Sequence, residues 1–124
     1  MATIVADTGA LISLGLIKKV DLIEKVLGEF FIPNAVWVEL QEFRSELNAD
    51  FFNYLSSKRI IIKTKNTLSL VMDFGESESV ILYKEIGADF LLIDDQKARK
   101  IAESLGVNCI GAIGILILAK KQAF

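Results

Sequence analysis

Carboxylates follow two apolar stretches of the chain at the point where each stretch ends. Asp7 comes directly after residues 3–6, and Asp94 and Asp95 follow residues 88–93. Short apolar runs are typical of buried parallel strands, and ligands bind beyond the carboxyl ends of such strands. If the two strands are neighbours, we expect these acids to face each other across one strand spacing of about 4.8 Å. Each aspartate could instead only cap the helix that follows it, since aspartate is a favoured N-cap residue.

Two glutamates share faces of predicted helices with apolar side chains. Glu39 lies three residues after Val36, on the border of an apolar helical stripe, and Glu78 lies three residues before Ile81. Glu76 points elsewhere on a regular helix, although a frayed first turn would bring it to the same side. Any of these glutamates could equally be a solvated acid that the helix dipole stabilises.

Carboxylates that converge without histidine or cysteine indicate a site for a hard cation, Mg²⁺ or Mn²⁺. Such ions bind phosphate oxygens, so phosphodiester hydrolysis is the chemistry to expect. The chain contains no histidine, which excludes Ser-His-Asp and Cys-His catalysis and histidine-ligated zinc. It also lacks both common glycine-rich phosphate-binding motifs.

The elements that must position these acids alternate along the 124 residues, which we expect to form one α/β domain. Apolar runs predict strands at residues 3–6, 29–32, 59–63, 88–93 and 107–110. Helical spacing predicts helices at residues 10–17, 20–27, 33–47, 50–57, 77–86, 96–105 and 113–121. Apolar strands separated by helices indicate a parallel sheet that is covered on both faces.

Four short motifs, in this order, resemble those of the PIN-domain family. They are Asp7-Thr8 after the first strand, Glu39 within residues 35–40, the acidic stretch 75–81 and the strand end 91–99. The resemblance spans almost the whole chain. It implies a three-layer α/β/α PIN-like fold over residues 1–124, with a central, mostly parallel sheet of about five strands. It also implies a metal-dependent ribonuclease.

The resemblance also assigns roles to individual residues. It implies catalytic roles for Asp7, Glu39, Glu78 and Asp95. It implies that Mg²⁺ or Mn²⁺ is bound by Asp7, Glu39, Asp95 and Asp94. Thr8 would support these ligands, and Glu76 is the alternative to Glu78 as the third acid. Lys97, Arg99 and Lys100 could contact the RNA backbone, although a solvated helix face explains these three residues as well.

Many small PIN-domain proteins are VapC-like toxins of toxin–antitoxin pairs, so the resemblance implies RNA as substrate, a small antitoxin as partner and a homodimer. Two apolar clusters also favour a protein partner, because one small domain does not readily cover them. They consist of Leu11, Leu14, Leu16 and Ile17, and of Phe51, Phe52 and Tyr54.

Two other functions stay open. A non-catalytic PIN-like module that binds RNA or a protein is one, because the third acid is glutamate where the family usually has aspartate. A receiver domain of a signalling relay is the other. It would need an aspartate after the third strand, where this chain has Lys63, and a pair of acids after the first strand, where it has only Asp7.

Composition sets further limits on these functions. The net charge of −2 gives the chain no overall attraction to nucleic acid, so contacts with RNA would have to be local. A single cysteine, Cys109, cannot form an intrachain disulfide and fits a reducing cytoplasm. No apolar stretch approaches the roughly 20 residues of a spanning helix. We therefore expect a cytoplasmic protein without a membrane partner.

Overall fold

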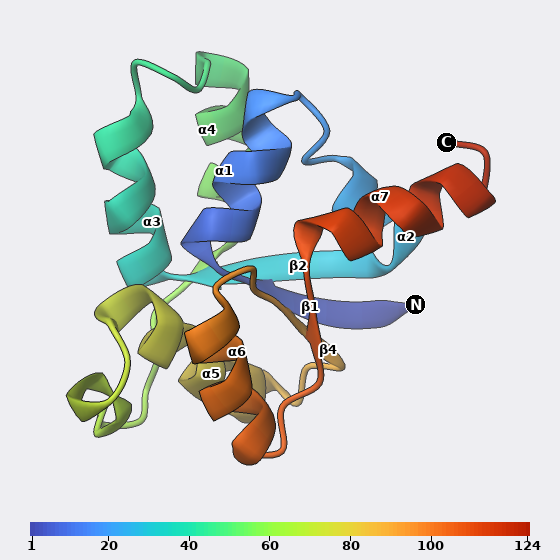
Figure 1. Cartoon of the computed structure of the whole chain (residues 1–124). Helices are drawn as coiled ribbons and strands as arrows, with labels where there is room; N and C mark the ends of the chain where they lie inside the picture. Colours follow the sequence, from blue (N-terminus) through green and yellow to red (C-terminus); the bar gives the residue numbers. More distant parts are fainter.

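A five-stranded sheet between two layers of helices forms the centre of the computed structural model, which describes all 124 residues (Figure 1). The strands are β1 (Ala2–Ala6), β2 (Gly28–Pro33), β3 (Arg59–Ile60), β4 (Phe90–Leu92) and β5 (Cys109–Ile110). Their spatial order is β3-β2-β1-β4-β5, and every neighbouring pair is parallel. The three-layer α/β/α fold with five strands is therefore confirmed.

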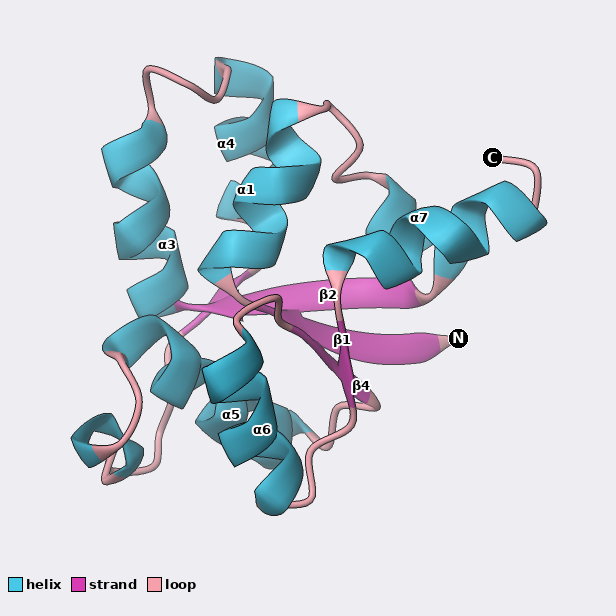
Figure 2. Cartoon of the chain, viewed as in Figure 1, coloured by secondary structure: helices cyan, strands magenta, loops and turns pink.

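The helices divide between the two faces of the sheet (Figures 1 and 2). One face is covered by α1 (Thr8–Leu16), α2 (Leu22–Val26), α3 (Asn34–Leu40), α4 (Ala49–Ser56) and α7 (Ala112–Lys121). The other is covered by α5 (Phe74–Ile86) and α6 (Gln96–Ser104). Each face of the sheet has its own apolar core. Along β1, Ile4 and Ala6 point into the core under α1, and Val5 points into the core under α5 and α6, because successive side chains of a strand point to opposite faces.

The point where the strand order reverses lies between β1 and β4. Ala6 of β1 is paired with Leu92 of β4, so the two strands end at the same level. The chain leaves β1 into α1 on one face and leaves β4 into α6 on the other (Figure 1). In an open parallel sheet, this divergence creates a crevice at the carboxyl edge, where ligands bind.

Three predicted elements begin or end at least three residues from the predicted position. β3 is only two residues long, and the predicted helix 33–47 ends as an α-helix at Leu40 and continues as the 3₁₀ turn η1 (Gln41–Phe43). A second 3₁₀ turn, η2 (Leu68–Leu70), lies in the predicted polar connection. Helix α5 begins at Phe74, three residues before the predicted start, and this shift changes which glutamate faces the crevice.

The prediction that two apolar clusters remain uncovered is wrong for most of their members. Leu11, Leu14, Phe51 and Phe52 are buried in the core between the sheet and its first helical layer. Tyr54 is half-buried and donates its hydroxyl proton to Glu24. The helices α1 and α4 pack on the same core, so each covers apolar side chains of the other. Only Leu16 and Ile17 remain exposed.

None of the helices combines the length and the apolar character that a membrane-spanning segment requires.

Candidate functional site

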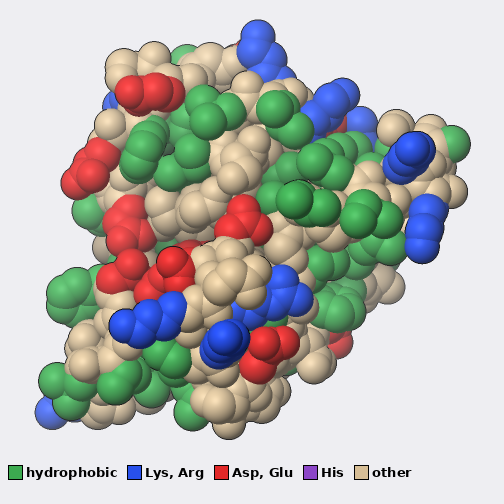
Figure 3. Space-filling view, in the orientation of Figure 1, with side chains coloured by type: hydrophobic (Ala, Val, Ile, Leu, Met, Phe, Trp, Pro, Cys, Tyr) green, Lys and Arg blue, Asp and Glu red, His purple; other side chains and the backbone are tan.

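An acidic cavity of about 320 Å³ opens at the carboxyl edge of the sheet, in the crevice between α1, α3, α5 and α6. Its lining includes six carboxylates and no lysine or arginine. The lining residues are Asp7, Thr8, Gly9, Ile12, Glu39, Glu42, Phe43, Asp73, Glu76 and Asp95. In the space-filling view, acidic side chains gather in the middle of this face (Figure 3). Among the predicted site residues, Asp7, Thr8, Glu39, Glu76 and Asp95 are thus brought together.

Asp7 is the most deeply buried acid of the cavity, with 5% of its surface exposed. It occupies the N-cap position of α1, yet its side chain makes no capping hydrogen bond, so capping does not explain this residue. The Ser79 hydroxyl lies 3.4 Å from Asp7 Oδ1 but 2.7 Å from the Gly75 carbonyl oxygen, and its single proton favours the shorter bond. Asp7 is therefore a buried carboxylate with little hydrogen bonding from side chains.

The surroundings of Asp7 favour its neutral form. The pKa of Asp7 is raised to about 7, chiefly by burial and also by the carboxylates of Glu76, Glu39 and Asp73, whereas the backbone N–H of Thr8 opposes the rise. Desolvation and like charges both penalise the ionised state of an acid. A cation bound beside Asp7 would remove this penalty.

Glu39 reaches the cavity from α3, and the Thr8 hydroxyl donates to its Oε1 at 2.5 Å. The backbone N–H of Gly75 faces the same carboxylate and favours its charged form. Burial is the largest effect on the pKa of Glu39 and raises it. The charges of Asp73 and Glu42 add to the rise, whereas the Thr8 hydroxyl and the Gly75 N–H oppose it. A Cβ atom on Gly75 would lie 2.0 Å from Glu39 Oε1, so this close approach requires glycine.

The start of α5 supplies two more acids through a capping box. Asp73 accepts the Glu76 backbone N–H at 2.8 Å, and Glu76 Oε1 accepts the Asp73 backbone N–H at 3.3 Å. Burial, followed by the Asp73 charge, raises the pKa of Glu76. Both carboxylates line the cavity, so the capping groups of the helix are also potential cation ligands.

Glu78, the predicted third acid, lies outside the cavity. Its Oε1 accepts the backbone N–H of Ala35 at 3.0 Å, at the start of α3. Because α5 begins at Phe74, Glu76 occupies the first turn beside the cavity and Glu78 points toward α3. The structure therefore corrects the expectation for Glu78 and brings Glu76, its alternative, into the cavity.

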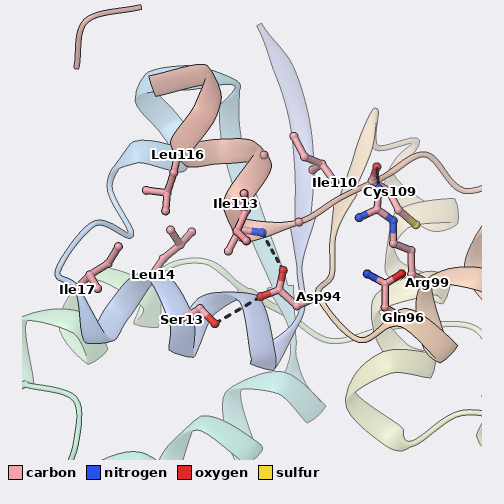
Figure 4. A pocket seen from close by; sticks show the side chains of 13 residues that line it. Ser13, Leu14, Ile17, Asp94, Gln96, Arg99, Cys109, Ile110, Ile113 and Leu116 are labelled. Atoms are coloured by element: carbon pink, nitrogen blue, oxygen red, sulfur yellow. Dashed lines mark hydrogen bonds between the residues drawn. The ribbon is translucent and has the colours of Figure 1, made fainter. Parts of the chain in front are cut away.

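Asp94 and Asp95 point to different cavities. Asp94 Oδ1 accepts the Ala112 backbone N–H at 2.8 Å at the start of α7, and its Oδ2 lies 3.4 Å from the Ser13 hydroxyl (Figure 4). It lines a separate cavity of about 610 Å³ beside α1 and α7. Asp95 lines the acidic cavity and also caps α6, accepting the Ala98 N–H at 2.8 Å. Asp94 is thus placed to join helices, contrary to the ligand role that the resemblance implies.

The three basic residues predicted to contact RNA also differ in position. Lys97 lines a groove next to the acidic cavity. Arg99 donates to the Cys109 carbonyl oxygen at 3.3 Å and lies 4.0 Å from Glu103, beside the Asp94 cavity (Figure 4). Lys100 is exposed and lines no cavity described above. Lys97 is the one of the three that lies near the acids.

Two acids of the cavity, Asp73 and Glu42, are absent from the set predicted from sequence. Asp73 could have been found, because aspartate followed three residues later by glutamate before an apolar run is the signature of a capping box. Glu42 has no such signal. It is exposed and reaches the rim only because η1 follows α3 directly.

The donor set fits a hard divalent cation, since all six acidic groups offer carboxylate oxygens. As they are placed, no three acidic side chains lie close enough together to ligate one ion. Binding would therefore require rotamer changes that draw the carboxylates together. Burial first, and the charges of neighbouring carboxylates second, raise the pKa values of Asp7, Glu39 and Glu76, and a bound cation would offset both effects.

Comparison with known families gives one match. A family model described as a PIN domain matches residues 3–124, a range that contains every residue of the acidic cavity. No curated protein matches the sequence.

Proposed function

Because the chain belongs to the PIN-domain family, we propose that it is a metal-dependent ribonuclease that hydrolyses phosphodiester bonds in RNA. The observation that carries this proposal is the cavity at the strand switch point, which has six carboxylates and no basic side chain in its lining. A polyanionic substrate would be repelled by such a cavity unless cations were bound there. Nuclease chemistry at this site thus requires Mg²⁺ or Mn²⁺.

Asp7, Glu39 and Asp95 would hold the ion, with Glu76 as the acid from α5. A bound Mg²⁺ or Mn²⁺ polarises a phosphoryl oxygen and lowers the pKa of an attacking water. Thr8 donates to Glu39 and so fixes the direction of that carboxylate. Asp7 is buried away from bulk water, which strengthens its own electrostatic interaction with a bound ion.

The test is cleavage of single-stranded RNA by the purified protein with Mn²⁺ or Mg²⁺ and with EDTA. We expect cleavage only with metal, and we expect Asp7→Asn to abolish it. Glu76→Gln and Glu78→Gln form a matched pair on one helix. The first should lose activity and the second should retain it, since Glu78 lies outside the cavity.

A non-catalytic PIN-like module that binds RNA or a protein is the second candidate. The observation that favours it is that no three acids of the cavity are placed to share one ion. RNA that binds to the protein but stays intact with both metals would support this candidate and contradict the nuclease.

Within the nuclease proposal, the protein is the toxin of a toxin–antitoxin pair and works in the cytoplasm as a homodimer that a small antitoxin binds. The support is exposed apolar side chains in the lining of the Asp94 cavity, Ile17 directly after α1 and Ile113 of α7 (Figure 4), with Leu16 and Ile117 also exposed on the same two helices. Such a surface is typical of protein interfaces. A stable monomer in sedimentation, with no co-purifying small protein, would contradict this part.

A further inference from the structure

A groove of about 430 Å³ adjoins the acidic cavity, and we call it the flanking groove. Its lining residues are Ser69, Leu70, Val71, Met72, Asp73, Glu76, Asp95, Lys97, Ala98 and Ile101. Asp73, Glu76 and Asp95 line both spaces. The groove is therefore continuous with the acidic cavity, and the three shared carboxylates stand at the junction.

Part of the lining of the flanking groove is apolar and faces solvent. Leu70 is 90% exposed and Val71 is 59% exposed, and neither belongs to one of the two cores. These two large apolar side chains therefore offer apolar surface inside the groove without contributing to the packing of either core.

The flanking groove also has one cationic side chain, Lys97, from the first turn of α6. Lys97 forms no ion pair within the chain, since the three ion pairs of the structure involve other residues. The groove thus combines an apolar wall, an unpaired cation and direct access to the acids. A nucleotide has the matching parts, because its base is flat and largely apolar on its faces and its phosphate is anionic.

We propose that the flanking groove binds the nucleotide adjacent to the scissile phosphodiester of a single-stranded RNA. The base lies on Leu70 and Val71, and its phosphate contacts Lys97. This inference rests on the proposed nuclease function and adds to it a binding site for the nucleotide next to the cleaved bond. In a duplex the bases are stacked and paired, so only a single strand can place a base on the apolar wall.

The first experiment measures binding of a short fluorescein-labelled oligouridine by anisotropy, in the cleavage-deficient Asp7→Asn background with Mn²⁺. We expect Leu70→Ser combined with Val71→Ser to raise Kd about tenfold, which corresponds to about 1.4 kcal/mol. Lys97→Gln should reduce the slope of log K against log salt by about 1, as expected for one lost phosphate contact.

Matched controls separate the groove from general effects of surface changes. Ile61→Ser removes another exposed apolar side chain, directly after the edge strand β3, and Lys121→Gln removes a cation at the end of α7. Both should leave Kd and the salt slope unchanged. The groove proposal is wrong if the Leu70/Val71 double variant binds RNA as its parent does, or if Ile61→Ser weakens binding equally.

A second substrate distinguishes failure of the groove from failure of the nuclease. Bis(p-nitrophenyl) phosphate is a phosphodiester without a flanking nucleotide, and its hydrolysis with Mn²⁺ reports on the acidic cavity alone. For the Leu70/Val71 double variant with Asp7 intact, the ratio of RNA cleavage to diester hydrolysis should fall about tenfold. Unchanged melting temperatures would show that the variants fold. If wild type hydrolyses neither substrate, the nuclease proposal fails; if wild type is active and the ratio is unchanged, only the groove fails.

Discussion

Two cavities lie on either side of the Asp94–Asp95 pair, and they use adjacent carboxylates in different ways. In the larger cavity, Asp94 accepts a backbone N–H at the start of α7 and lies close to the Ser13 hydroxyl, and Arg99 is near (Figure 4). In the smaller cavity, Asp95 joins five other carboxylates, and the lining contains no basic side chain. One aspartate therefore stabilises a helix junction, and the other faces a concentration of negative charge.

The difference shows how the surroundings of an acid separate a structural role from a chemical one. Asp94 and Glu78 each accept a backbone N–H at a helix start, which satisfies the charge and contributes about 1 kcal/mol or more to stability. Asp7 and Glu39 are instead desolvated among like charges, and the pKa of each is raised. Folding does not benefit from such an arrangement, so a ligand is the better explanation for it.

The largest expected difference between Asp95 and Asp94 is in the activity of their asparagine variants. Asp95→Asn should lower kcat/KM for RNA with Mn²⁺ by at least about a hundredfold, because loss of a direct metal ligand should exceed the 10–100-fold typical of supporting residues. Asparagine can still cap α6, so the fold should persist. Asp94→Asn should stay within a few-fold of wild type, since its carbonyl oxygen can still accept the Ala112 N–H. Equal loss in both variants would mean that Asp94 is also a ligand.

Two glycines beside the acidic cavity give a second, smaller test. A methyl group on Gly75 would displace Glu39, whose Oε1 lies 2.0 Å from the position of that Cβ, whereas nothing lies within 4 Å of the corresponding position on Gly9. We expect Gly75→Ala to lower kcat/KM about tenfold or more, with little loss of stability because a flexible carboxylate can move. Gly9→Ala should keep activity and stabilise α1 by about 0.5–1 kcal/mol.

Kinetics and thermal melts of the two variants, side by side, provide the measurement. If Gly75→Ala were as active as wild type, the position of Glu39 would not matter for the reaction. If it unfolded the protein, Gly75 would be needed for the fold rather than for placing the carboxylate.

The sequence was sufficient to predict the sheet and the position of its functional edge. Apolar runs identified all five strands, and the acids after residues 3–6 and 88–93 do lie at one edge because β1 and β4 are neighbours. Burial on both faces makes such strands continuous apolar runs, so the pattern is strong even when a strand is short. Because side chains alternate in direction along an extended segment, Asp94 and Asp95 are expected to point to different sides after β4. The sequence alone does not say which of the two faces the cavity.

The third acid could not be chosen from helical spacing, because the choice depends on where α5 begins. A predicted start at residue 77 places Glu78 in the first turn, whereas the start at Phe74 places Glu76 there. The Asp73–Glu76 capping box carried the information that fixes this start. The sequence also could not tell whether Lys97 or Arg99 is free to contact RNA. The two residues differ in a tertiary contact, because Arg99 donates to the Cys109 carbonyl oxygen.

The last expected effect concerns stability against pH, and it sharpens the contrast between Asp7 and Asp94. The folded-state pKa of Asp7 is raised to about 7, above the ordinary value of about 3.9 in an unfolded chain. A raised pKa gives stability that is fully present below the unfolded value and is lost as pH rises through the folded one. In EDTA, the free energy of unfolding should therefore fall between about pH 5 and about pH 8, by on the order of 1 kcal/mol per pH unit.

Urea unfolding at the two pH values, with and without Mn²⁺, measures this contribution. Asp7→Asn should flatten the pH dependence, because the amide does not ionise, and Asp94→Asn should leave it in place. Mn²⁺ should restore wild-type stability near pH 8, since an ion bound only by the folded state contributes about 2.7 kcal/mol at a hundredfold excess over Kd. In a domain of this size, that corresponds to a melting shift on the order of 10 °C. If Mn²⁺ shifted wild type and Asp7→Asn equally, the acids would not form a metal site, and the non-catalytic module would be the better account of this chain.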